Sequence, residues 1–217
     1  MGETASATTF VVGDRLPWPD DGLASEFKGT FETGAIHHGG SRRECSIRKI
    51  SALGVMVGID ISPALGDQVG IELGTGQRSS GKVAWTGRSE LGIRFDDSVD
   101  VVALINRNLV SQPAERREMP RVEIRCPCYL KCGGKLMLAA IRNISSKGVQ
   151  LESDELPEPG TYVTVLVEGL NVPGGEVVWR RDRLAGIELM EELSWSSIVS
   201  WVRVAVRQTS PDLLSQR

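Results

Sequence analysis

Short runs of alternating apolar and polar residues fill the second half of the chain. They lie at 122–130, 135–145, 148–153, 161–169, 174–182 and 184–190. Each run is rich in Val, Ile and Leu, and Gly, Pro or charged residues separate it from the next. This period of two, with turns at short intervals, predicts antiparallel strands of a small barrel or sandwich. The fold class is therefore predicted to be mainly β.

The same residue pattern occurs twice in the chain. The segment "IRKISALGV" at 47–55 recurs as "IRNISSKGV" at 141–149, at an offset of 141 − 47 = 94 residues. Gly, Pro and Trp positions keep this offset, as in Pro63 and Pro157, Gly81 and Gly175, Trp85 and Trp179, and Gly92 and Gly186. A period this long indicates duplicated domains, since solenoid repeats run to about 20–50 residues. We predict domains at 21–111 and 112–208, joined near "SQPAERRE", with a disordered tail at 1–20 and a second tail at 209–217.

A helical pattern closes each copy. In the second it runs over about 194–207, where Leu193, Ile198, Trp201 and Val202 form an apolar face and Ser194 is suited to an N-cap. In the first it runs over about 98–110, with Val101, Leu104, Ile105 and Leu109 on the apolar face. Such helices are predicted to plug one end of a barrel or to pack between the two domains.

Composition narrows the function. The chain has 217 residues, 41% of them hydrophobic and 24% charged, with a net charge of −3. An acidic balance argues against a general nucleic-acid binder, which carries a clustered basic excess. No apolar run approaches the roughly 20 residues that span a bilayer, and the N-terminus lacks the pattern of a secretory signal. We expect a cytoplasmic protein that neither inserts into membranes nor binds nucleic acid.

The cysteines and histidines do not predict a metal site. Cys126, Cys128 and Cys132 share the strand parity of Val122, Ile124 and Leu130, which places them among core residues behind a polar outer face. No CxxC pair is present, and no nearby histidine could complete a set of ligands. His37 and His38 are neighbours on a predicted strand and point apart. No metal and no cofactor is predicted.

An arginine-rich segment lies just before the strands of the second copy. "RREMPR" at 116–121 is biased toward an extended chain by Pro120. In that conformation Arg117 and Arg121 share a face about 13 Å apart, at roughly 3.3 Å per residue. Arginine binds phosphate bidentately and stacks on flat rings, and it can also bond the O6 and N7 edge of guanine. The spacing suits a ligand with two phosphates and aromatic bases.

The segment "NISSKG" at 143–148 offers a complementary surface. Asn143 and Ser145 are two apart and face the same side of a strand, while Ile144 faces the core. Their side chains can bond a base edge or a phosphate. Gly148 is expected to permit a tight turn and a close approach of ligand or backbone.

The R-x-x-x-R segment followed by N-x-S-x-x-G resembles the PilZ family. The resemblance spans about residues 116–207 and implies a six-stranded antiparallel β-barrel with a C-terminal helix. It further implies a bacterial receptor that binds cyclic di-GMP through Arg117, Arg121, Asn143, Ser145 and Gly148. Arg116 extends the segment to R-R-x-x-x-R, which resembles family members that bind a stacked pair of ligands. The whole chain would then be two tandem PilZ-like barrels.

The first copy lacks the ligand groups. At the offset of 94, Leu23, Phe27 and Lys49 stand where Arg117, Arg121 and Asn143 stand in the second copy, and only Ser51 and Gly54 are kept. The first copy is therefore predicted to be a degenerate PilZ-like barrel that contacts a protein target.

Two other functions compete with a receptor. A ligand-independent adaptor would use both copies for protein contacts, and the intact Arg117, Arg121 and Asn143 argue against it. An enzyme is disfavoured because the sequence offers no nucleophile–base pair, phosphate loop or metal set. Trp85 and Trp179 are interpreted as core or barrel-rim residues, not as stacking platforms.

Overall fold

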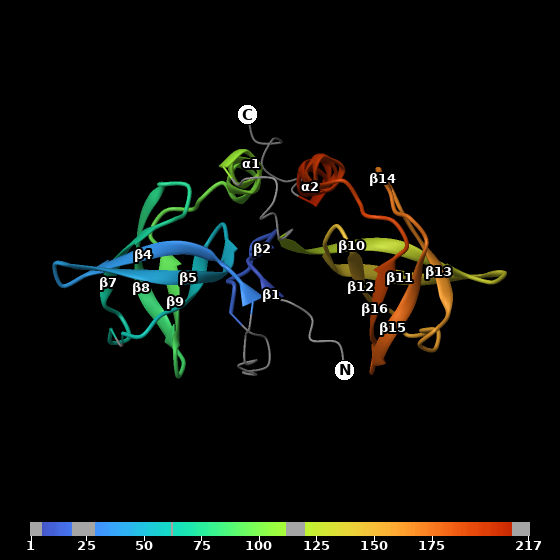
Figure 1. The fold of residues 1–217 in the computed structure, drawn as a ribbon, viewed down its shortest axis with the longest axis horizontal. Coiled ribbons are helices and arrows are strands. Elements are labelled where there is room, and N and C mark those ends of the chain that lie inside the picture. The colour runs from blue at the N-terminus through green and yellow to red at the C-terminus, as the bar shows by residue number, and fades with distance from the viewer. Residues whose placement is uncertain (1–5, 19–28, 62, 112–119, 210–217) are drawn as a thin grey trace, which may run out of the picture. The chain divides into compact units, whose positions relative to one another are not determined.

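The computed structural model describes residues 6–18, 29–61, 63–111 and 120–209. The chain divides into two compact units, unit 1 at Met1–Pro120 and unit 2 at Arg121–Arg217, shown in Figure 1. Within the described ranges, no helix is long and apolar enough to cross a membrane.

Unit 2 is a closed antiparallel barrel of six strands with a C-terminal helix, as the alternating pattern predicted (Figure 1). Its elements are β10 (Arg121–Cys132), β11 (Lys135–Ile144), β12 (Gly148–Glu152), β13 (Tyr162–Val167), β14 (Leu170–Asn171), β15 (Gly175–Arg181), β16 (Leu184–Leu189) and α2 (Trp195–Thr209). Pairing runs β10–β11–β12–β16–β15–β13 and returns from β13 to β10. The two-residue strand β14, which pairs with β13, was not predicted. Closure leaves no open sheet edge in the ring.

The barrel interior is filled by the inward residues of each strand. Leu130, Ile141, Ile144, Leu151 and Val177 are all 0% exposed. The cysteines of β10 also face inward as the alternation predicted, since Cys128 is buried and Cys126 and Cys132 are half-buried. Burial raises the pKa of the Cys128 thiol to about 12, so this cysteine packs as a small apolar residue.

Helix α2 covers one end of unit 2. Its predicted apolar face is confirmed, with Leu193, Ile198, Trp201 and Val202 all at most 4% exposed. The Trp201 Nε1 donates to the Glu168 carbonyl at 3.0 Å. The Ser197 N–H donates to Ser194 Oγ at 3.1 Å, so Ser194 is the N-cap that the sequence indicated.

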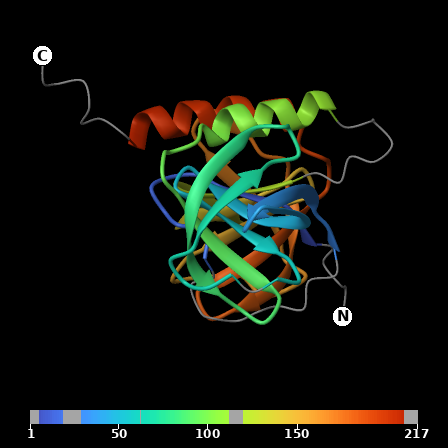
Figure 2. The same ribbon diagram turned by 90° about the vertical axis from the view of Figure 1, so that its left-hand side faces the viewer.

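The elements of unit 1 are β1 (Ser6–Ala7), β2 (Thr9–Val11), β3 (Gly29–Thr30), β4 (Glu32–His38), β5 (Ser41–Ser51), β6 (Gly54–Gly58), β7 (Gln68–Glu72), β8 (Arg78–Thr86), β9 (Glu90–Phe95) and α1 (Val101–Ser111). Pairing runs β5–β4–β7–β8–β9–β6 and returns from β6 to β5. In Figure 2, which shows unit 1 toward the viewer, α1 lies across one end of these strands.

Helix α1 starts later than predicted. The Ala103 N–H donates to Asp100 Oδ1 at 2.9 Å, so Asp100 is the cap and the expected start near Ser98 is wrong. Val101, Leu104 and Ile105 are buried as predicted. The side chain of Leu109 lies outside the described residues.

The prediction of a disordered tail at 1–20 is wrong for its described part. Strand β2 pairs in parallel with β5, and Phe10 and Val11 are each 2% exposed. A β-branched and aromatic triplet, Thr-Phe-Val, has the composition of a strand and the apolar surface to hold one in place. The short run was overlooked because its polar surroundings resemble a tail.

The two units share their strand register at the offset of 94. Lys49 pairs with Met56 as Asn143 pairs with Gln150, and Trp85 pairs with Gly92 as Trp179 pairs with Gly186. The irregularities recur too, at Ile47/Lys49 and Ile141/Asn143, and at Val83/Trp85 and Val177/Trp179. Equivalent positions in the two units can therefore be compared residue by residue.

We expect Ser194→Ala to lower the free energy of unfolding by about 1 kcal/mol, because an N-terminal amide of α2 loses its acceptor. Chemical denaturation of the two proteins measures the change. Ser200→Ala, at an exposed site in the same helix, is the matched control and should be neutral. An equal loss of unfolding free energy in the two variants would contradict the role of Ser194 as the N-cap of α2.

Candidate functional site

A β-bulge in β11 sets the direction of the candidate site. Ile141 pairs with Leu151 and Asn143 with Gln150, so Arg142 is an extra residue opposite β12. Ile141 and Ile144 are both 0% exposed although they are three apart, which a regular strand does not allow. The bulge places Arg142 and Asn143 together outside the core, and Ile144 faces inward as predicted.

Asn143 belongs to a row of residues across the outer face of unit 2. Backbone pairing links Asn143 to Gln150, Gln150 to Gly186, and Gly186 to Trp179. We call these four residues the Asn143 row. Neighbouring strands lie about 4.8 Å apart, so the row extends over roughly 14 Å. A flat organic ligand of nucleotide size would span it.

Trp179 is on the outer surface, not in the core. It is 41% exposed, and its indole ring lies so close to Gly186 that a Cβ there would overlap Nε1. Gly186 thus makes room for the ring to lie against the sheet. An aromatic ring in this position offers a stacking surface, which sequence reasoning missed. The recurring Trp–Gly pairs, Trp85 with Gly92 and Trp179 with Gly186, were the available signal.

Ser145 and Gly148 lie one step beyond the core pair Ile144–Val149. The Ser145 N–H donates to the Gly148 carbonyl at 2.9 Å, and Ser145 Oγ contacts the same oxygen at 3.3 Å. A Cβ at Gly148 would lie 2.8 Å from the Ile187 carbonyl oxygen. Glycine is therefore required by the close approach of the β16 backbone, which is one of the two reasons that the sequence suggested. Ser145 itself is half-buried.

Arg121 begins β10 at the same edge. Its neighbour Val122 pairs with Ile144, so Arg121 and Ser145 are the next residues along the two strands. Arg121 is half-buried, and burial lowers the pKa of its guanidinium. Among the described residues, no hydrogen bond or ion pair engages this guanidinium. A partly desolvated cation without a counter-charge is suited to binding an anion.

The other arginines of this face are already paired. Arg142 Nη1 donates to Glu152 Oε2 at 2.6 Å, and Arg125 Nη2 lies 3.6 Å from the same oxygen. The hydrogen bond from Arg142, ahead of the charges of Arg142 and Arg125, holds the pKa of Glu152 below its usual range. These two cations are therefore less available to a ligand than Arg121. The predicted site residues Arg116 and Arg117 lie outside the described residues.

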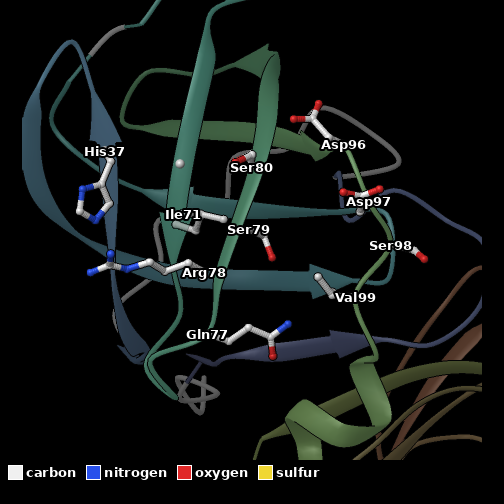
Figure 3. Close-up of a pocket in the computed structure, with 11 residues that line it drawn as sticks. His37, Ile71, Gln77, Arg78, Ser79, Ser80, Asp96, Asp97, Ser98 and Val99 are labelled. Carbon is white, nitrogen blue, oxygen red and sulfur yellow. The ribbon is translucent and has the colours of Figure 1, made fainter.

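Unit 1 contains a separate polar cavity of about 460 Å³. Figure 3 shows His37 and Arg78 on one side of it and Asp96, Asp97 and Ser98 on the other. Glu72 already neutralises the cationic side, with Oε2 2.9 Å from Arg78 Nη2 and 3.4 Å from His37 Nε2. The cavity lacks an unpaired cation comparable to Arg121. His38 separately contacts Asp67 at 3.1 Å, which agrees with the prediction that the two histidines point apart.

Residues 115–203 match the family model of the PilZ domain. The matched span is less than half of the chain, and it includes both predicted motifs and the Asn143 row. The match is to the family that the motif spacing had indicated. Curated protein sequences show no match to the chain.

Several solved structures resemble the chain weakly. The PlzA protein of Borreliella burgdorferi, solved in complex with c-di-GMP, is 12% identical with a TM-score of 0.33, covering 78% of this chain and 86% of its own. The inhibitor of motility MotI/DgrA of Bacillus subtilis is 13% identical with a TM-score of 0.30, covering 82% and 96%. YcgR of Escherichia coli, in complex with c-di-GMP, is 11% identical with a TM-score of 0.29, covering 82% and 87%. Scores this low carry no inference about fold or function.

One carboxyl in unit 1 has a strongly shifted pKa. Glu32 starts β4, and its Oε1 is buried without a hydrogen-bond partner among the described residues. Burial raises the pKa of Glu32 to about 7. Because the pKa is higher in the folded state than the usual value of about 4.3, the protonated carboxyl favours folding. This contribution is complete below about pH 4 and is lost as the pH rises through about 7.

We expect Glu32→Gln to weaken the fall in stability between pH 5 and 8, because the amide needs no proton to remain neutral. At pH 8 the variant should be more stable than the wild type, by at most about 3 kcal/mol. Urea denaturation at several pH values measures this. Glu44→Gln, at an exposed position of the neighbouring strand, should keep the wild-type profile. An unchanged profile for Glu32→Gln would contradict the assignment.

Proposed function

We propose that unit 2 is a receptor for cyclic di-GMP that performs no catalysis. The observation that carries the proposal is the half-buried Arg121, which has no partner among the described residues, at the edge that also holds Asn143, Ser145 and Gly148. This edge lies within a region that matches the PilZ family. Arg121 and Arg117 bind phosphate or guanine, and Asn143 and Ser145 bond a base edge and a phosphate. The indole of Trp179 offers a face to a guanine base.

The Arg segment connects binding to signalling. Arg117 and Arg121 lie on either side of the boundary between the two units at Pro120 and Arg121. A ligand held by both arginines fixes the conformation of the chain between them, and ordering of a segment is an established form of switch. The bound state then presents different contacts to a protein target. Unit 1, as a degenerate PilZ-like barrel without the arginines and with Lys49 in place of Asn143, serves this contact.

Titration calorimetry of the full chain with cyclic di-GMP, with GTP as the control ligand, tests the proposal. Binding at about 1 μM or tighter, absent with GTP, is the expected result. A stoichiometry of two would assign Arg116 to a stacked pair of ligands, whereas one would limit the site to Arg117 and Arg121. Absence of binding would favour the ligand-independent adaptor.

We expect Arg121→Ala to weaken cyclic di-GMP binding by roughly 10- to 100-fold, as the loss of a charge-assisted hydrogen bond to a charged group predicts. Arg121→Lys should recover only part of the loss, because an ammonium cannot bind bidentately. Calorimetry measures the affinities, and melting of the ligand-free variants checks the fold. Arg125→Ala removes an exposed arginine from the same strand and is the matched control. Equal losses for Arg121→Ala and Arg125→Ala would contradict the role of Arg121.

We expect Lys49→Asn to create no second site, although it restores the residue of unit 2 at that position. The first copy has Leu23 and Phe27 where the second has arginines, so the asparagine has no phosphate-binding partner. Calorimetry of Lys49→Asn combined with Arg121→Ala isolates unit 1. Binding by this double variant beyond that of Arg121→Ala alone would refute the expectation.

A further inference from the structure

The first residues of the chain cover the face of unit 1 that corresponds to the Asn143 row. The equivalent positions are Lys49, Met56, Gly92 and Trp85, which we call the Lys49 row. Met56 is 0% exposed, whereas its counterpart Gln150 is half-buried. Ser51 is also 0% exposed, whereas its counterpart Ser145 is half-buried. Another part of the chain therefore covers Met56 and Ser51 in unit 1.

Part of the cover is strand β2. In unit 2 the strand beside Asn143 is β10, antiparallel, with Glu123 opposite Asn143. In unit 1 the corresponding place beside Lys49 is taken by β2 in parallel, with Thr9 opposite Lys49 and Val11 opposite Ser51. Val11, which is 2% exposed, therefore stands beside Ser51 as Arg121 stands beside Ser145. An apolar residue occupies the place of the anion-binding arginine.

The segment is anchored at both ends. The Thr8 hydroxyl donates to the Ile47 carbonyl at 2.8 Å and accepts from the Glu32 N–H at 2.8 Å. At the other end the Trp18 indole lies on two glycines, since Cβ atoms built at Gly92 and Gly54 would be 2.6 and 3.4 Å from its ring carbons. In unit 2 the corresponding glycine, Gly186, is covered by the indole of Trp179 itself.

We propose that residues 8–18 form a strap that occupies the face of unit 1 equivalent to the ligand face of unit 2. The strap supplies a strand in place of the arginine segment and an indole in place of a stacked base. It closes this face even to a ligand that the side chains of unit 1 could otherwise contact. The contacts of the strap stand independently of the ligand proposed for unit 2.

The strap is a separable part of the fold. Its pairing with β5 is only three residues long, and one indole holds its far end, so its opening is a local event that leaves the ring of strands intact. Opening would uncover Met56, Gly92 and Ser51 at the surface. The exposed face would be apolar at Met56, and the cationic Lys49 lies beside it.

Amide hydrogen exchange of the full-length Trp18→Ala variant tests the strap. We expect exchange to rise at least about tenfold at 9–11, 49–51 and 54–56, with β7 unchanged, because β7 pairs with β4 and β8 and not with the strap. Trp18→Phe should restore most of the protection, since it keeps an aromatic ring. Thr8→Val, which removes the hydroxyl bonds at the opposite anchor, should produce a local increase of the same kind.

Two outcomes would overturn the proposal. Wild-type protection at 9–11 and 54–56 in both Trp18→Ala and Thr8→Val would show that the anchors do not hold the segment. An equal rise in β7 would show that residues 8–18 are an integral part of the core and not a separable strap. Cyclic di-GMP affinity, measured on the same variants, should match the wild type, so a failure of the receptor proposal is recognised separately.

Discussion

The candidate site depends on one irregularity, the β-bulge at Arg142. Ile141 and Ile144 must both face the barrel interior, and only an extra residue between them allows this. The same residue turns Arg142 and Asn143 outward together. Arg142 is then neutralised by Glu152, whereas Asn143 faces outward and Arg121 has no partner in the part of the chain that the structure describes. A core-packing requirement thereby fixes the direction of the recognition groups.

Unit 1 has a bulge at the equivalent position, but the outer face beside it is built differently. Ile47 and Ile50 are both buried and Lys49 is turned outward, yet the face that follows is covered by the chain itself. Trp18 lies on Gly92, whereas Trp179 lies on Gly186 within its own unit. Two units with the same strand register can thus differ in their outer surfaces, because different segments cover the outer faces while the bulge positions stay the same.

Much of the fold followed from local patterns. The strands of unit 2, the apolar face of α2 and the cap at Ser194 were all predictable, because alternation and capping depend on residues near in sequence. The bulge was also present in the sequence, as two isoleucines three apart in each copy, although strand alternation alone does not reveal it. Of the two placements predicted for Trp179, core or barrel rim, the core placement is wrong, because the glycine that makes room for its ring, Gly186, is on another strand.

The sequence by itself determined the recurrence of a residue pattern at an offset of 94 residues, the order of the arginine-bearing and asparagine-bearing motifs, and the resemblance of the second copy to the PilZ family. Only the tertiary structure decided which arginine lacks a partner among the described residues, where the indole of Trp179 lies, and that residues 8–18 lie over one face of unit 1. The physical reason is distance along the chain. Periodicity and caps are short-range, whereas the pairing of Thr9 with Lys49 and the contact of Trp18 with Gly92 exist only once the strands have closed.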